Sequence, residues 1–306
     1  MNIPHKPVLL NEVLEVFESL NEGVFVDATL GYGGHSEAIL TAHPKLKLIG
    51  IDRDDEAIAF STKRLEKFGD RVQIIKSDFG SALSKIDTSN VVGILADIGV
   101  SSLQLDKKER GFSFESETLD MRMDSTQEFS AYDVVNGYSE AELEKIIRVY
   151  GEERYSKKIA ALIVKRRKEE KIQSAKELAA LISQNIKGFK IHPATLTFQA
   201  IRIEVNSELE QLEDLLENVK KLPQKGQILG IISFHSLEDR IVKTAFKDWS
   251  RSCICPPEAM RCTCGNNNEL GDIVTKKPLT GTDAEIRENP RARSAKLRAF
   301  KFANND

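Results

Sequence analysis

The sequence predicts an α/β protein with a doubly wound, Rossmann-like sheet that is split by an inserted helical domain. Buried strands alternate with amphipathic helices from about residue 24 to 97, which is typical of a parallel sheet. Helical patterns then follow for over a hundred residues, before an apolar strand resumes at 227–235. We therefore expect residues 1–115 and 213–306 to form one split domain, and residues 116–212 to form the helical insert.

The individual elements follow from apolar runs and helix-capping signals. The first two strands of the sheet each end in an aspartate, Asp27 and Asp52. The second helix is expected to begin at Asp54, a good N-cap, with acids in its first turn and basic residues later. Strands are expected at 24–27, 47–52, 71–76 and 91–97, and helices at 34–42, 54–68, 141–150, 156–170, 174–186, 194–205, 208–221 and from about 237.

Composition excludes several classes of protein. The chain has 306 residues, of which 41% are hydrophobic and 30% charged, enough for a sizeable core. Its longest apolar runs are far shorter than the roughly 20 residues of a membrane span, and its N-terminus resembles no signal peptide. We expect a cytosolic protein with no membrane contact, and the net charge of −3 excludes a uniformly basic nucleic-acid binder.

A glycine-rich segment joins the first strand to the first helix, as in nucleotide-type sites. Gly31 and Gly33 let a ligand approach the backbone, and Asp52 can accept hydrogen bonds from both hydroxyls of a ribose. A dinucleotide fingerprint would have a third glycine where this chain has Ser36. S-adenosylmethionine therefore fits better than a dinucleotide, with Asp27 expected to hold its ammonium group. A tight turn with incidental glycines is the structural alternative.

Polar residues also follow the third and fourth strands. Ligands of open α/β sheets lie outside the carboxyl ends of the strands, so a methyl acceptor would meet Asp97 and Ser101. An amine on a base is a poor nucleophile, and these groups could orient and polarise it. Alternatively, Asp97 caps the strand and Ser101 caps a helix. Phe79 would lie near an adenine, or would belong to the core.

Ten short segments resemble the bacterial MraW family, also called RsmH, of small-subunit ribosomal RNA (cytosine-N4) methyltransferases. The resemblance extends from about His5 to Arg298. It rests on GGHS at 33–36, IDRD at 51–54, DIGVSS at 97–102, RGFSF at 110–114, LDMRMD at 119–124, HPAT at 192–195, TFQAIR at 197–202, VNSEL at 205–209, SFHSLEDR at 233–240 and ENPRARS at 288–294.

The resemblance implies methylation of the N4 amine of one cytidine in the decoding region of 16S rRNA. The donor would be S-adenosylmethionine, the partner 16S rRNA within the small ribosomal subunit, and the chain either a monomer or a homodimer. Carried over by position, the donor-binding residues are Gly33, Gly34, His35, Asp52, Phe79, Asp97 and Gln104.

Contacts to the substrate are expected at the end of the resumed strand and in basic segments. His235 would position the flipped base and act with Asp97 and Ser101 in catalysis, although a lone histidine at such an edge is more often structural. A basic helix at 157–171 and a basic tail at 287–298 could contact phosphates, or could be solvated surfaces. The substrate-binding residues expected are Arg202, Asn206, Ser233, Ser236, Arg240, Arg291 and Arg293.

The four cysteines, Cys253, Cys255, Cys262 and Cys264, form two Cys-x-Cys pairs within twelve residues. Four thiolates would suit tetrahedral Zn²⁺, so we expect a structural zinc site. The spacing is tighter than in the usual Cys-x₂-Cys pairs, and the alternative is a set of reduced surface cysteines.

Overall fold

The computed structural model describes residues 7–100, 107–187, 191–222, 226–256, 258 and 261–304. It divides the chain into two compact units, a sheet unit of Met1–Gly99 and Glu210–Asp306 and a helical unit of Val100–Leu209. Residues 107–115, expected in the split domain, fall in the helical unit, because Phe112 is buried in its core. The observed boundary thus precedes the expected one at residue 116.

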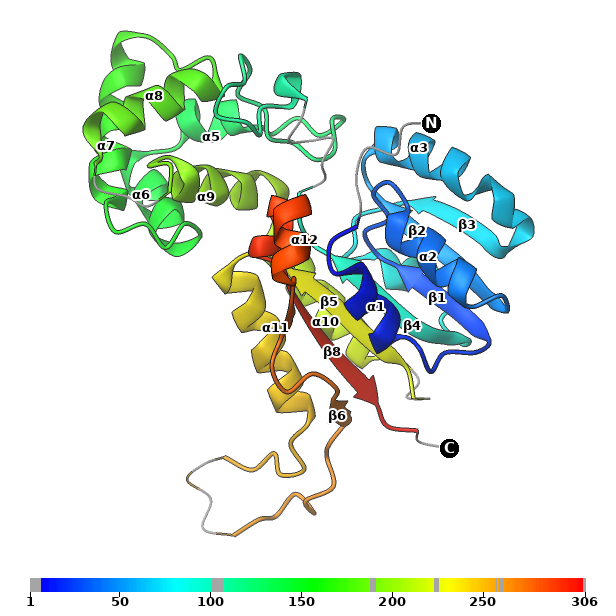
Figure 1. The fold of residues 1–306 in the computed structure, drawn as a ribbon. Coiled ribbons are helices and arrows are strands. Elements are labelled where there is room, and N and C mark those ends of the chain that lie inside the picture. Colours follow the sequence, from blue (N-terminus) through cyan, green and yellow to red (C-terminus); the bar gives the residue numbers. More distant parts are fainter. Residues whose placement is uncertain are drawn as a thin grey trace. The chain divides into compact units, whose positions relative to one another are not determined.

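The sheet unit contains an eight-stranded sheet in which the first five strands are parallel (Figure 1). The strand order is β3-β2-β1-β4-β5-β8-β6, and β7 pairs with β8. Strand β8 runs antiparallel to β5 and to β6. The strands are β1 Gly23–Asp27, β2 Leu46–Asp52, β3 Val72–Lys76, β4 Val91–Asp97, β5 Ile228–Ser233, β6 Gly271–Ile273, β7 Leu279–Thr280 and β8 Lys296–Phe302.

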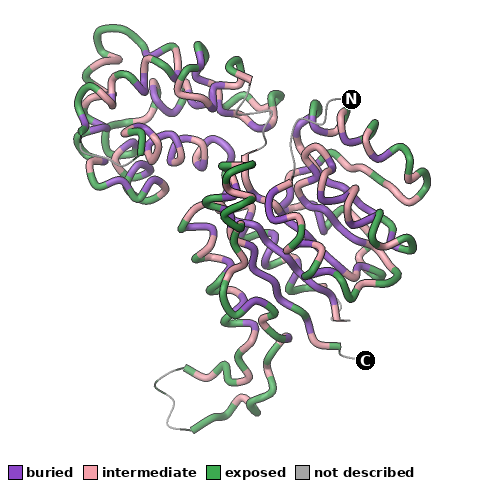
Figure 2. Tube along the Cα trace, in the orientation of Figure 1, coloured by how far each residue is buried: buried purple, intermediate pink, exposed green. Residues whose placement is uncertain are grey.

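Helices cover both faces of this sheet because successive side chains of each strand point to opposite faces. Phe25 lies in one hydrophobic cluster with α1, α2 and α3, whereas its neighbour Val26 lies in the other cluster with α10 and α11. Strands β1, β2, β4, β5 and β8 are accordingly buried along most of their length, whereas β3 has no fully buried residue (Figure 2). The helices are α1 Leu10–Val16, α2 Gly34–Ala42, α3 Asp55–Leu65, α10 Glu208–Lys220, α11 Ser236–Trp249 and α12 Asp283–Glu288, with short 3₁₀ turns at 66–71, 82–85 and 290–293.

The helical unit has its own core, formed by one apolar stripe from each helix. Capping boxes start two of these helices, at Ser130 and Ser139. The helices are α5 Ala131–Gly137, α6 Glu140–Val149, α7 Ser156–Glu169, α8 Ala175–Asn185 and α9 Thr195–Asn206, with a 3₁₀ turn at 108–110. The sequence-predicted helices agree with α6 to α11 within about two residues at each end, the usual uncertainty of helix boundaries.

The basic tail contributes a central strand that the sequence analysis did not specify. Lys296 and Arg298 on β8 both bind Asp239, with nitrogen–oxygen distances of 3.2 and 2.7 Å. The sequence analysis expected the basic tail that contains these two side chains to contact phosphates. In the structure, the two side chains join β8 to α11.

Asn206 closes helix α9 with an internal hydrogen-bond network. Its Oδ1 accepts from the Met123 amide at 2.8 Å, and its Nδ2 donates to the carbonyls of Met121 (2.8 Å) and Arg202 (2.9 Å). The side chain is buried. Asn206 thus connects the segment at 121–123 to α9 inside the helical unit.

Asn206→Ala is expected to lower the free energy of unfolding by about 3 kcal/mol, because the substitution leaves a buried amide and a buried carbonyl without partners. Urea unfolding measures the loss. Asn185→Ala is the matched control, since the side chain of the exposed Asn185 donates to the carbonyl of Leu181 one turn earlier on the helix surface, and it should cost less than about 1 kcal/mol. Equal effects of the two substitutions would contradict the structural role of Asn206.

Candidate active site

Three aspartates mark the carboxyl edge of the sheet, where adjacent parallel strands end side by side. Asp52, Asp27 and Asp97 close the neighbouring strands β2, β1 and β4. The loop at 28–33 follows β1, the middle strand of the three. Open α/β sheets bind their ligands at this edge, so it is the candidate site.

Asp27 orders the loop from inside. Its Oδ2 accepts a 2.6 Å hydrogen bond from the Ser36 hydroxyl, and its Oδ1 accepts from the Thr29 amide at 3.3 Å. Burial raises the pKa of Asp27 to about 6, although the Ser36 hydroxyl opposes the shift. Asp27 is 2% exposed and its described hydrogen bonds are to the protein, and its expected role in holding a ligand's ammonium group stays a prediction. Ser36, which departs from the dinucleotide fingerprint, instead ties α2 to β1.

Asp52 binds the same loop from the neighbouring strand. Its Oδ2 accepts from the Gly31 amide at 2.7 Å and its Oδ1 from the Asp54 amide at 2.9 Å. Burial raises the pKa of Asp52, while both amides oppose the shift. The position of Asp52 beside the glycine loop suits the predicted contact with a ribose, which stays a prediction.

The glycines of the loop have different reasons to be glycine. Gly31 and Gly33 adopt φ angles of 51° and 71°, in the left-handed region that favours glycine. At Gly34, a Cβ would lie 2.4 Å from Cγ of Pro7. Gly34 is therefore required for packing within the protein, and its predicted donor contact stays a prediction.

Asp97 has the most unusual environment of the three carboxylates. Its backbone amide donates to Thr29 Oγ1 at 2.6 Å, which fixes the end of β4 to the loop. Its Oδ1 is buried and has no hydrogen-bond partner among the residues that the structure describes. Burial raises the pKa of Asp97 to about 7; the Gly99 amide opposes this shift and Glu238 adds to it. An acceptor at this place is available for a donor group from a ligand.

His35 lies beside Asp97 as a neutral imidazole. Its Nε2 is 2.8 Å from the Val8 carbonyl, which can only accept, so this nitrogen carries the proton. Its Nδ1 lies 3.9 Å from Asp97 Oδ2. Burial lowers the pKa of His35. The unprotonated Nδ1 and the Asp97 carboxyl are thus neighbouring acceptors at the end of β4.

At the end of β5, His235 caps a helix. Its Nδ1 accepts from the Glu238 amide at 3.4 Å, and its Nε2 lies 3.0 Å from Glu238 Oε1. Glu238 Oε2 accepts from the amides of Phe234 and His235. These contacts favour the structural reading of His235, and its substrate role stays a prediction. The Phe234 ring lies so close to Gly99 that a Cβ there would be 2.4 Å from Cε2.

Other predicted residues of the sheet unit have less direct support. Phe79 is 9% exposed and belongs to the buried cluster that contains Leu212 of α10, as its core reading expected. Ser233 is buried and its hydroxyl contacts the Lys296 carbonyl at 3.5 Å. The binding roles of these residues stay predictions, as do those of four residues outside the buried core, Ser236, Arg240, Arg291 and Arg293.

In the helical unit, the predicted substrate residues bind to protein groups. Arg202 forms a two-point ion pair with Glu208 at 2.8 and 2.7 Å. Along the basic helix α7, Arg166 pairs with Glu170 and Glu177, while Arg167 donates to backbone carbonyls. The predicted RNA contacts of Arg202 and Asn206 stay predictions. Ser101 and Gln104 lie outside the described residues.

Sequence reasoning missed the groups that hold the site together. Thr29 and Glu238 were given no role, although Thr29 accepts from the end of β4 and Glu238 binds the turn after β5. An acid three residues after an N-cap is a capping-box signal that could have identified Glu238. The cross-strand role of Thr29 has no local signal.

Comparison with known proteins settles the family. A model of the MraW methylase family matches residues 2–303. The chain belongs to this family. It is 60% identical over 304 residues to "Ribosomal RNA small subunit methyltransferase H" of Nitratiruptor sp., covering 99% of each chain. Proteins of the same name from Nautilia profundicola and Wolinella succinogenes are 59% and 57% identical, with 98% and 99% of each chain covered.

Family membership confirms that the chain is a methylase, while the contact of the glycine loop with the donor stays a prediction. The edge formed by Asp52, Asp27 and Asp97 remains the candidate site of the methylase. In the part of the chain that the structure describes, no helix is both long and apolar enough to cross a membrane.

Asp97→Asn is expected to stabilise the fold at alkaline pH. Burial raises the pKa of Asp97 to about 7, so between about pH 4 and 7 the native state keeps a proton that the unfolded chain has lost. Stability therefore falls as pH rises through this range, and the neutral amide avoids the fall. The free energy of unfolding of the variant minus that of wild type should be about 2 kcal/mol larger at about pH 8 than at about pH 5.

Urea unfolding at the two pH values measures this difference. Asp55→Asn is the control, because Asp55 is exposed and pairs with Lys76 on the surface. Its effect should change little between the two conditions. If Asp97→Asn also has the same effect at both pH values, Asp97 is not a buried, proton-retaining carboxyl.

Proposed function

We propose that this protein transfers a methyl group from S-adenosylmethionine to the N4 amine of a specific cytidine in the decoding region of 16S rRNA of the small ribosomal subunit. Membership of the MraW methylase family and the name of its relatives support the reaction and the rRNA class. The observation that carries the chemistry is the buried, unpartnered Oδ1 of Asp97 at the carboxyl edge of the sheet.

The residues at this edge suit the donor. Gly31 and Gly33 form a turn without side chains, and Asp52 lies at the end of the adjacent strand, within 2.7 Å of the Gly31 amide. A carboxylate there can accept from ribose hydroxyls. When bound, S-adenosylmethionine supplies an electrophilic methyl group on a sulfonium sulfur and is left as S-adenosylhomocysteine.

Asp97 and its surroundings would activate the amine. The lone pair of a cytosine N4 amine is delocalised into the ring, so the amine needs orientation by acceptors of its hydrogens. Asp97 Oδ1 is such an acceptor, and His35 Nδ1 lies near the other carboxylate oxygen. N4 forms the new bond to carbon and then loses one proton, which the Asp97 carboxylate accepts. A pKa of about 7 keeps Asp97 close to the balance between its two protonation states.

Asp52→Asn is expected to weaken S-adenosylmethionine binding by about 10- to 100-fold, because the substitution removes a charged acceptor of two hydroxyls. Isothermal titration calorimetry measures the dissociation constant. The exposed Asp55→Asn variant should bind like wild type. Binding of NAD by the wild-type protein in place of S-adenosylmethionine would refute the donor assignment.

Incubation of small ribosomal subunits with radiolabelled S-adenosylmethionine, followed by mass-spectrometric mapping, should place one label on N4 of a 16S rRNA cytidine. Asp97→Asn should lower the transfer rate by about 100-fold or more while changing donor affinity far less. The wild-type rate should rise with pH up to about 7 and then level off, because the ionised carboxylate is the acceptor. Label on DNA, on protein or on another atom of the base would overturn the proposal.

A further inference from the structure

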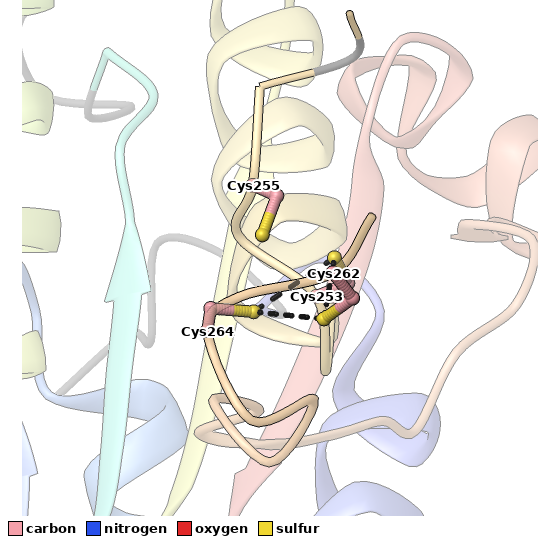
Figure 3. A group of neighbouring side chains, drawn as sticks. All are labelled: Cys253, Cys255, Cys262 and Cys264. Atoms are coloured by element: carbon pink, nitrogen blue, oxygen red, sulfur yellow. Dashed lines mark hydrogen bonds between the residues drawn. The ribbon is translucent and has the colours of Figure 1, made fainter. Parts of the chain in front are cut away.

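The loop between α11 and β6 brings four thiols together, away from the carboxyl edge described above (Figure 3). The sulfur atoms of Cys253, Cys255, Cys262 and Cys264 all lie within 4.8 Å of one another. None of the four is in a disulfide. This convergence of sulfurs is the starting point of the inference.

The separations between sulfurs match a tetrahedral metal site. Four thiolates about 2.3 Å from a central Zn²⁺ lie about 3.8 Å from one another. The distances found are 3.7 Å between Cys253 and Cys262, 3.6 Å between Cys262 and Cys264, and 3.8 Å between Cys264 and Cys253. A disulfide would need about 2.05 Å. The three separations among Cys253, Cys262 and Cys264 thus have the length that binding to one shared ion would impose.

Backbone amides support the sulfurs in a reciprocal arrangement. The amide of Ile254, the middle residue of the first Cys-x-Cys pair, donates to Cys264 of the second pair at 3.4 Å. The amide of Thr263, the middle residue of the second pair, donates to Cys255 of the first at 3.3 Å. Hydrogen bonds of this kind stabilise negative charge on ligating sulfur and orient it. Each Cys-x-Cys pair therefore supplies a backbone hydrogen bond that orients a sulfur of the other pair.

The loop lacks the usual means of staying ordered. It spans about twenty residues from the end of α11 to the start of β6, a length at which such loops are uncommon, and its described residues contain no helix or strand. Its large apolar side chain Ile254 is 63% exposed. Its ends are joined by hydrogen bonds from Leu270 to the Trp249 carbonyl (2.7 Å) and from Asn268 to the Ser252 carbonyl (3.0 Å). A metal ion bound to the four sulfurs would restrain the cysteine-containing segment of the loop.

We propose that the four thiolates bind one Zn²⁺, and that this ion fixes the conformation of the loop at 250–270. A four-sulfur tetrahedral set selects zinc or iron among the common metals, and zinc needs no redox partner. All four positions are filled by protein, which makes the ion structural. The fixed loop supplies Ile254 and Asn268 to one wall of a groove of about 1010 Å³ that α10, α11 and Trp249 complete.

Metal analysis of the purified full-length protein tests the proposal. Wild type should hold about one zinc ion per chain after dialysis against a weak chelator, whereas Cys255→Ser and Cys264→Ser should hold close to none. Thr263→Ser is the matched control, since it lies between two ligands and leaves all four thiols, and it should retain zinc. Protein without zinc that has four free thiols, that has disulfides, or that contains iron would overturn the assignment.

Two further readouts report on the loop without relying on the variants or on methyl transfer. Removing zinc from wild type with a strong chelator should make the bond after the exposed Arg261 sensitive to trypsin. It should also change the fluorescence of Trp249, the protein's single tryptophan, which lines the groove beside Ile254. Adding Zn²⁺ back should reverse the fluorescence change and protect protein that has not been cleaved. Unchanged cleavage and fluorescence after zinc release would refute the role of the ion in ordering the loop.

Discussion

The candidate active site depends on one constraint, that the loop after β1 is bonded to the ends of three strands at once. The Thr29 amide donates to Asp27 on β1, the Gly31 amide donates to Asp52 on β2, and the Thr29 hydroxyl oxygen accepts from the Asp97 amide on β4. Each bond joins a loop group to a different strand. These bonds hold the loop in a fixed position relative to the sheet. A ligand bound to the loop is therefore positioned relative to the strand ends.

This arrangement limits the access of water to two acidic groups, since Asp27 is 2% exposed and Asp97 has a buried Oδ1 on a side chain that is 21% exposed. Burial raises the pKa of Asp27 to about 6 and that of Asp97 to about 7, and the two carboxyls differ in how they are compensated. Asp27 accepts from Ser36 and Thr29, so its function is to organise the loop. Asp97 has a buried oxygen without a partner among the described residues, and such a group costs free energy until a donor reaches it. A carboxyl such as Asp97, with a shifted pKa and an oxygen left for a ligand, is typical of groups that act on a ligand.

The sequence predicted most of the architecture because strands and helices have local periodic signals. It also predicted that Asp52 and Asp97 would share an edge, since both close strands of one parallel sheet. It did not predict the internal use of Asn206, whose partners at 121 and 123 are more than eighty residues away. Lys296 and Arg298 were similarly misjudged, because the sequence shows their charge and not that Asp239 lies beside them. Positions fixed by long-range contacts have no local signature.

Two loops of the sheet unit, the glycine loop at 28–33 and the cysteine loop at 250–270, are ordered by different physical means. The glycine loop at 28–33 is short and lies against strand ends, so backbone amides and carboxylates suffice to fix it. The loop at 250–270 is longer, and its described backbone hydrogen bonds from Leu270 to Trp249 and from Asn268 to Ser252 join residues near its two ends. In the proposal above, zinc bound by the four thiolates provides a further restraint. Because the two segments share none of these bonds, ordering of the cysteine loop can be lost while the donor loop keeps its structure.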